Sequence, residues 1–273
     1  MASALSFIQL TQDSFDRTQR LVLPSLPYAI LFTLALGVLI WAANILPDGG
    51  YGFVIFSALT FATLFAHNLF SVSMYHAVLP TTAAIPTAAW KLTLAWILVI
   101  VIAAIAGSMI TLFFALIGAS LGVGTSEDVN NISDMTAQMR EGGTFWPLFI
   151  LFMATLLGVF WFAARIMTFA AATASRGRVH VLRTWYWTKG HFRVLGPAML
   201  ILVVLPLIIL TFLGALISGA LIGPSPSPIG AGVSTALAML ILLPSAWLGH
   251  GFAASVFERL APEDEDQTTT PAS

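Results

Sequence analysis

The chain has 273 residues, of which 58% are hydrophobic and only 8% are charged. Soluble domains carry roughly 25% charged residues, so this composition excludes a soluble globular protein and predicts an all-α, polytopic transmembrane helix bundle. The absence of cysteine excludes disulfides, thiol catalysis and cysteine-bound metals. The net charge of −1 excludes little, because the distribution of charges along a membrane protein matters more than their sum.

Residues 1–20 precede the first long apolar run and have a different pattern. Leu5, Ile8 and Phe15 recur near one face of a helix, and the charged residues cluster at the far end of the segment. An apolar face combined with a charged end is typical of an amphipathic helix lying in the membrane interface. The sequence therefore predicts an interfacial helix at residues 1–20, leading into the first span, and a frayed tail is the alternative.

Six apolar runs predict six spans in a transmembrane domain of residues 21–260. The third run rises about 1.5 Å per residue and exceeds the ~30 Å hydrocarbon core, so it must tilt, project or break, with Gly107 and Gly118 as candidate breaks. An acidic loop follows at residues 124–144, and the acidic, Thr- and Pro-rich residues 261–273 favour disorder. The expected spans are about 24–46, 51–79, 92–123, 146–174, 195–222 and 231–257.

The distribution of basic residues predicts the orientation of these spans. In bacterial membranes the short loops that carry Lys and Arg stay in the cytoplasm. If both termini are cytoplasmic, only Arg140 falls outside, while Arg165 lies within the fourth span. We therefore expect a multi-pass protein of the bacterial inner membrane with cytoplasmic N- and C-termini. The nine residues then placed at the cytoplasmic side are Arg17, Arg20, Lys91, Arg176, Arg178, Arg183, Lys189, Arg193 and Arg259.

The ends of the even-numbered spans resemble one another and suggest three repeated helical hairpins. Asn68–Pro80, Arg165–Gly177 and His250–Pro262 align without gaps, and each begins with a lone polar residue in an apolar stretch. Small residues follow at helical spacing in all three segments. A repeated hairpin is one way to build a six-span bundle, and chance similarity among Ala-, Phe- and Ser-rich helices is the alternative.

Several polar residues inside the spans form a candidate intramembrane site. If the repeat holds, Asn68, Arg165 and His250 lie at one depth and could face a common centre, with Arg165 holding a phosphate or carboxylate group. The alternative is structural: Arg165 extends to the headgroups, and the other two residues make hydrogen bonds between helices. The candidate site comprises His67, Asn68, Ser71, Tyr75, Arg165 and His250.

The segment Arg176–Gly196 combines positive charge with adjacent Trp and Tyr residues between two apolar runs. This pattern is typical of a segment at the headgroup level, which either binds anionic lipid headgroups or a membrane-protein partner, or serves only to fix topology. No basic domain extends beyond it, so nucleic-acid binding is not expected. The expected headgroup-binding residues are Arg176, Arg178, Arg183, Lys189 and Arg193.

The residues Thr184–Gly196 also carry a family resemblance. They are similar to the pattern W-x-L-T-K/R-G-x-F/W-x-x-L/V-x-G of uncharacterised bacterial multi-pass proteins, which resemble the membrane domain of some glycerophosphodiester phosphodiesterases. Lys189, Gly190, Phe192 and Gly196 match, while Trp187 stands where Leu is commoner. The resemblance covers this loop with the fourth and fifth spans. It implies a helical membrane module without catalytic residues of its own, and the soluble phosphodiesterase domain is not in this sequence.

No catalytic, metal-binding or cofactor-binding pattern stands out in the sequence. There is no HExxH motif, and no pair of carboxylates lies inside a span. The sequence therefore favours a non-enzymatic membrane protein that is structural, lipid-interacting or partner-binding, without a cofactor or metal. Two alternatives stay open: a small transporter or permease-like subunit using the intramembrane polar site, and, less favoured, a membrane-embedded enzyme acting on lipid headgroups.

Overall fold

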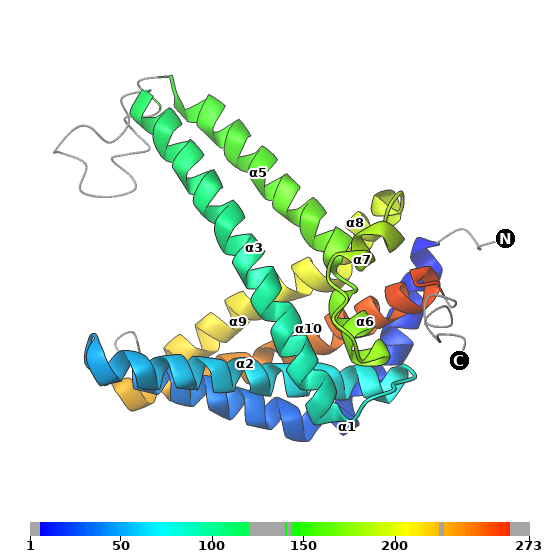
Figure 1. Cartoon of the computed structure of the whole chain (residues 1–273). Helices are drawn as coiled ribbons and strands as arrows, with labels where there is room; N and C mark the ends of the chain where they lie inside the picture. Colours follow the sequence, from blue (N-terminus) through cyan, green and yellow to red (C-terminus); the bar gives the residue numbers. More distant parts are fainter. Residues whose placement is uncertain (1–5, 121–139, 141–142, 224–226, 263–273) are drawn as a thin grey trace, which may run out of the picture. The chain divides into compact units, whose positions relative to one another are not determined.

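The computed structural model describes residues 6–120, 140, 143–223 and 227–262, and the regular structure of these residues is helical (Figure 1). Six helical stretches are long and apolar enough to cross a membrane. The predicted all-α fold with six membrane-spanning helices is therefore confirmed. The six stretches are Phe7–Ala43, Gly50–Val78, Ile85–Phe114, Phe145–Arg176, Phe192–Ile222 and Pro228–Leu260.

The chain divides into two compact units. One comprises Met1–Ala95 and Ala164–Ser273, and the other comprises Trp96–Ala163. The second unit holds most of α3 (Ile85–Ser120) and α5 (Phe145–Ile166). The remaining elements belong to the first unit and are α1 (Phe7–Ala43), α2 (Gly50–Val78), α6 (Phe169–Arg176), α7 (Arg183–Trp187), α8 (Phe192–Met199), the π-helical turn η1 (Leu200–Val204), α9 (Leu205–Ile222) and α10 (Pro228–Leu260).

Helix α1 is one continuous helix of 37 residues, so the structure has no break at the expected boundary between residues 20 and 21. Its first half is not merely a surface segment. Leu10, Ser14 and Leu21 are fully buried, and Leu10 packs against residues of α8 and α10. This packing continues the helix through the charged region that hydropathy separates from the span. The interfacial position of residues 1–20 stays a prediction.

The third and fourth predicted spans differ from each other in continuity. Helix α3 runs through Gly107 and Gly118 without a break. Of the three expected ways to fit this long run into the bilayer, breaking is thereby excluded, and tilting and projection stay open. The fourth span, expected as one helix, is divided between α5 and α6. The carbonyl oxygen of Arg165 accepts a hydrogen bond from Thr188 Oγ1 at 2.8 Å, and α6 restarts with the Ala172 N–H donating to the Thr168 carbonyl. The hydrogen bond from Thr188 therefore lies at the end of α5, where the fourth span divides into two helices.

The fifth span contains a π-helical turn between its two prolines. Leu200–Val204 forms η1, which joins α8 to α9. Pro206 lacks the N–H that would bond to the carbonyl of Leu202, so the regular α-helical ladder is interrupted here. The turn still packs into the bundle, because Leu202 is almost fully buried.

The core of the first unit lies between α1, α2 and α10, with α9 against α10 (Figure 1). Glycines allow α1 and α10 to approach closely. An added Cβ at Gly251 would lie 2.6 Å from Thr18 Oγ1 and 2.8 Å from the Ser14 carbonyl oxygen. Gly37 and Gly232 form a second close crossing of the same two helices. Ion pairs of Asp13 with Arg259 and of Arg17 with Glu258 join the start of α1 to the end of α10.

Candidate functional site

The three segments of the predicted repeat lie together in the first unit. The end of α2, helix α6 and the end of α10 contact one another pairwise. The three helices end at Val78, Arg176 and Leu260, within one residue of each other in the gapless alignment. The small residues Ser73, Ala170 and Ser255 are all buried. The packing therefore joins the three segments, and their common repeat origin stays a prediction.

Three of the predicted intramembrane residues, Ser71, Tyr75 and His250, meet between α2 and α10. Nδ1 of His250 lies 2.8 Å from the Ala246 carbonyl oxygen, which assigns the ring proton to Nδ1. Nε2 of His250 then accepts a hydrogen bond from Ser71 Oγ at 3.1 Å. The Tyr75 ring lies 5.2 Å from the His250 ring, whereas the His67 ring meets the Phe32 ring of α1 edge-on at 5.1 Å. These contacts connect α2 to α10 and to α1.

The other two predicted residues have different neighbours. Asn68 donates a 2.9 Å hydrogen bond to Thr93 Oγ1 at the start of α3. The guanidinium of Arg165 is buried and lies 4.8 Å from the centre of the Trp185 ring in α7. Asn68, Arg165 and His250 thus contact three different partners. Each of these contacts is one that a structural role requires.

Helix α7 has an inner face that attaches it to the bundle. Thr184 and Thr188 are fully buried, and Thr188 makes the bond to the Arg165 carbonyl. Trp185 packs under the Arg165 guanidinium. The Trp187 ring lies 6.0 Å from the ring of Phe257 in α10. These contacts fix α7 against the ends of α5 and α10, although it has only five residues.

The opposite side of this segment exposes both apolar and basic residues. Val179, Leu182 and Tyr186 are 44%, 62% and 72% exposed. Sequence reasoning did not select these three residues. The spacing of four between Leu182, directly before α7, and Tyr186, within it, is the signal of a shared helical face, whereas Val179 lies outside the helix. The exposed cations Arg178, Arg183 and Lys189 each lie within three residues of one of these apolar side chains in the sequence. We call this surface the α7 outer face, and its residues are Arg178, Val179, Leu182, Arg183, Tyr186 and Lys189.

Arg176 differs from the other basic residues of the segment because it is only partly exposed and is tied to α10. It donates a 2.6 Å hydrogen bond to the carbonyl oxygen of Pro262. Its guanidinium lies 4.9 Å from the Trp187 ring centre and 5.6 Å from that of Phe257. Arg176 therefore joins α7 to the end of α10. Arg193, in α8, is exposed, and its role in headgroup binding stays a prediction.

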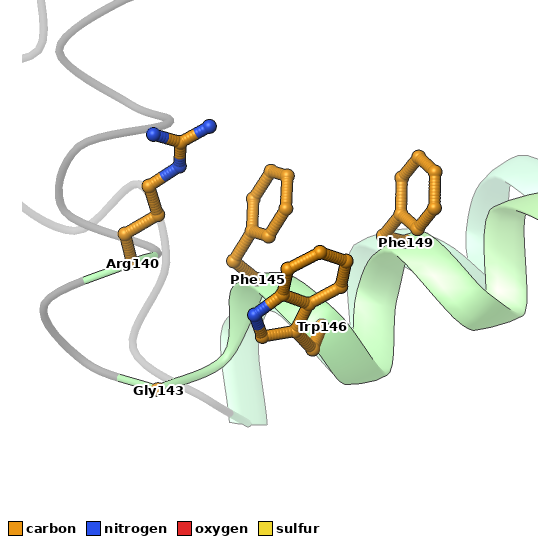
Figure 2. A pocket seen from close by; sticks show the side chains of 5 residues that line it. All are labelled: Arg140, Gly143, Phe145, Trp146 and Phe149. Carbon is orange, nitrogen blue, oxygen red and sulfur yellow. The ribbon is translucent and has the colours of Figure 1, made fainter.

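Arg140, the one basic residue expected outside, lines a separate pocket at the start of α5 (Figure 2). Its guanidinium lies 5.1 Å from the Phe145 ring centre. Phe145 stacks on Phe149 at 5.9 Å, and Trp146 meets Phe149 edge-on. An exposed cluster of aromatic rings with a cation is typical of an anchor at the membrane–water interface.

The search for metal ligands and for relatives adds no further assignment. Among the residues that the structure describes, no group of three His, Cys, Asp or Glu side chains could hold a metal ion. Most of the acidic loop 124–144 and residues 263–273 lie outside the described part. Comparisons with protein-family models, curated proteins and solved structures found no match for this chain.

Proposed function

We propose that this polytopic membrane protein is a non-enzymatic module of the bacterial inner membrane that binds anionic lipid headgroups through the α7 outer face. The observation that carries the proposal is the arrangement of that face. Exposed Leu182 and Tyr186 lie beside exposed Arg183 and Lys189, while the opposite side of α7 is attached to the bundle. Apolar side chains can enter the interface while the cations meet phosphate groups.

The physical chemistry of an anionic leaflet favours this arrangement. Each Lys or Arg near such a surface contributes about 1 kcal/mol of attraction. Tyr favours the headgroup level because its ring is apolar and its hydroxyl is polar. Within the described residues Arg178, Lys189 and Arg193 have no ion-pair partner, so their charges are available to a lipid. The rigid attachment of α7 limits the entropy lost on binding.

The proposed orientation places the α7 outer face and both termini in the cytoplasm. The bias of the basic residues supports it, because nine Lys and Arg residues then lie in the cytoplasm and only Arg140 falls outside. The resemblance of Thr184–Gly196 to a membrane domain without catalytic residues supports a non-enzymatic role. A transporter would use Asn68, Arg165 and His250 at one site. Their separate partners, Thr93, Trp185 and Ser71, favour structural roles for them instead.

Native mass spectrometry of the protein purified in mild detergent tests this proposal. We expect the wild type to retain phosphatidylglycerol in preference to phosphatidylcholine. Combined Arg178→Gln, Arg183→Gln and Lys189→Gln substitutions should reduce that preference roughly a hundredfold, because three contributions of about 1 kcal/mol each are lost. Arg140→Gln is the matched control, since it removes an exposed cation elsewhere and should leave the preference unchanged. Equal retention of both lipids by the wild type would refute the proposal.

A further inference from the structure

We propose that the acidic segment Glu263–Asp266 of the same chain docks on the α7 outer face and competes there with anionic lipid. The inference rests on the proposed function and adds its regulation. The structure describes the chain as far as Pro262, the residue directly before the acidic segment. The acidic segment must therefore reach the α7 outer face from Pro262.

Arg176 fixes that starting point beside the basic surface. Its side chain donates to the Pro262 carbonyl and stacks on Trp187 of α7. Phe257 of α10 packs against both Arg176 and Trp187, so the junction is held by three mutual contacts. Pro262, the residue directly before the acidic segment, is consequently held next to α7.

The distances along the chain are short enough for contact. One residue spans at most about 3.5 Å, so Glu263–Asp266 can reach about 14 Å from Pro262. Arg178 follows Arg176 by two residues, which places its Cα within about 7 Å of that of Arg176. Lys189 follows Trp187 by the same interval. Both cations therefore lie within reach of the acidic segment once side-chain length is added.

Charge complementarity identifies the occupant. The segment carries four consecutive acidic residues, Glu263, Asp264, Glu265 and Asp266. The exposed cations of the α7 outer face include Arg178 and Lys189, and neither has an ion-pair partner among the described residues. The nearby cations of the α1–α10 junction are already paired, Arg17 with Glu258 and Arg259 with Asp13. Like a headgroup, the acidic segment offers negatively charged oxygens, so it occupies the surface when anionic lipid is scarce.

The lysine content makes a direct test unambiguous. Lys91 and Lys189 are the only lysines of the chain, and Lys91 donates to the Gly177 carbonyl. A carbodiimide activates a carboxyl group, and the amine of a contacting lysine displaces the resulting urea to form an amide. In lipid-free detergent we expect Lys189 to crosslink to the tryptic peptide that begins at Leu260. Lys189→Arg keeps the charge and should abolish the crosslink.

Lipid titration tests the competition. Added phosphatidylglycerol should lower the crosslink yield, and phosphatidylcholine should not. Replacing the four acids together, by Glu263→Gln, Asp264→Asn, Glu265→Gln and Asp266→Asn, should tighten phosphatidylglycerol binding roughly three- to tenfold, because the surface is then always available. Asp48→Asn, in the turn after α1, is the matched control and should leave the affinity unchanged.

Failure of this inference differs from failure of the proposed function. No crosslink, in a protein whose Lys189 still reacts with an amine-directed reagent, would overturn the docking. Unchanged lipid affinity in the four-acid variant would overturn the competition, even where phosphatidylglycerol binds. If instead no preference for phosphatidylglycerol exists in any variant, the proposed function and the lipid competition both fail. The crosslink then reports on the intramolecular contact alone.

Discussion

Ser71 of α2 donates a hydrogen bond to His250 of α10, over 3.1 Å, in a part of the bundle where Ser71 is buried. Replacing Ser71 by Ala leaves Nε2 of His250 without its donor. We expect a loss of about 0.5–1.5 kcal/mol in the free energy of unfolding, the range of hydrogen bonds between membrane helices. Thermal or denaturant unfolding in detergent measures it. Ser73→Ala is the control, because Ser73 Oγ bonds within its own helix to Phe70. An equal loss in both variants would contradict the assigned role.

The close crossing of α1 and α10 predicts opposite effects for two glycines of one helix. Gly251→Ala places a methyl group within 3 Å of Thr18 Oγ1 and the Ser14 carbonyl, so it should cost about 1–3 kcal/mol. Gly249→Ala meets only Val203, at an ordinary 3.7 Å, and should be neutral or stabilising by up to about 1 kcal/mol because Ala favours helix. The unfolding midpoints of the two variants measure these effects. A Gly249→Ala variant less stable than the Gly251→Ala variant would exclude this packing.

Removal of Arg165 should release α7 from the bundle. Arg165→Ala deletes the guanidinium that covers Trp185, a loss of about 1–2 kcal/mol for a desolvated cation–aromatic contact. We expect faster proteolysis within residues 178–193 and a change in Trp fluorescence, with Arg165→Lys intermediate. Arg193→Ala removes an exposed cation and should change neither signal. If Arg165→Ala abolished a measurable solute flux while the proteolysis rate stayed unchanged, a transport role would replace the structural one.

The absence of cysteine permits a clean test of the proposed orientation. Asp48→Cys lies in the turn between α1 and α2, whereas Val179→Cys lies on the exposed α7 outer face. We expect a membrane-impermeant maleimide to label Asp48→Cys in intact spheroplasts and Val179→Cys only after lysis. The unmodified chain supplies the background. Labelling of Val179→Cys in intact spheroplasts would reverse the proposed topology.

Hydropathy was sufficient to predict the six helices that are long and apolar enough to span a membrane. The second span was expected at about 51–79 and α2 occupies Gly50–Val78. The sequence predicted a helix in the first half of α1 as a segment separate from the span, because charged residues interrupt the apolar run. In the structure one helix continues through this region, with Leu10 and Ser14 buried. Helix continuity here depends on a partner, α10, that local sequence does not reveal.

The candidate site was predictable in composition and less so in geometry. The sequence identified the polar residues inside the spans but not their partners. Asn68 and Ser71 lie one turn apart on α2, yet they bond to α3 and α10 respectively. The rotation of each helix about its axis decides such partners, and this rotation follows from packing across the whole bundle. The division of α7 into inner and outer faces likewise depends on where Thr188 finds its acceptor.

The pairing of α1 with α10 has a consequence for biosynthesis. Ribosomes make α1 before the other five spans, yet Asp13 and Arg17 find their ionic partners only on α10. Nascent α1 therefore enters the membrane with the charged side of its first half unmatched, while Gly251 has yet to be added opposite Thr18. Arg176 likewise makes its contacts with Phe257 and Pro262 only after those later residues have been synthesised. Completion of the bundle coincides with synthesis of its last helix, so chains stopped before α10 should be recognised by membrane proteases as unfinished.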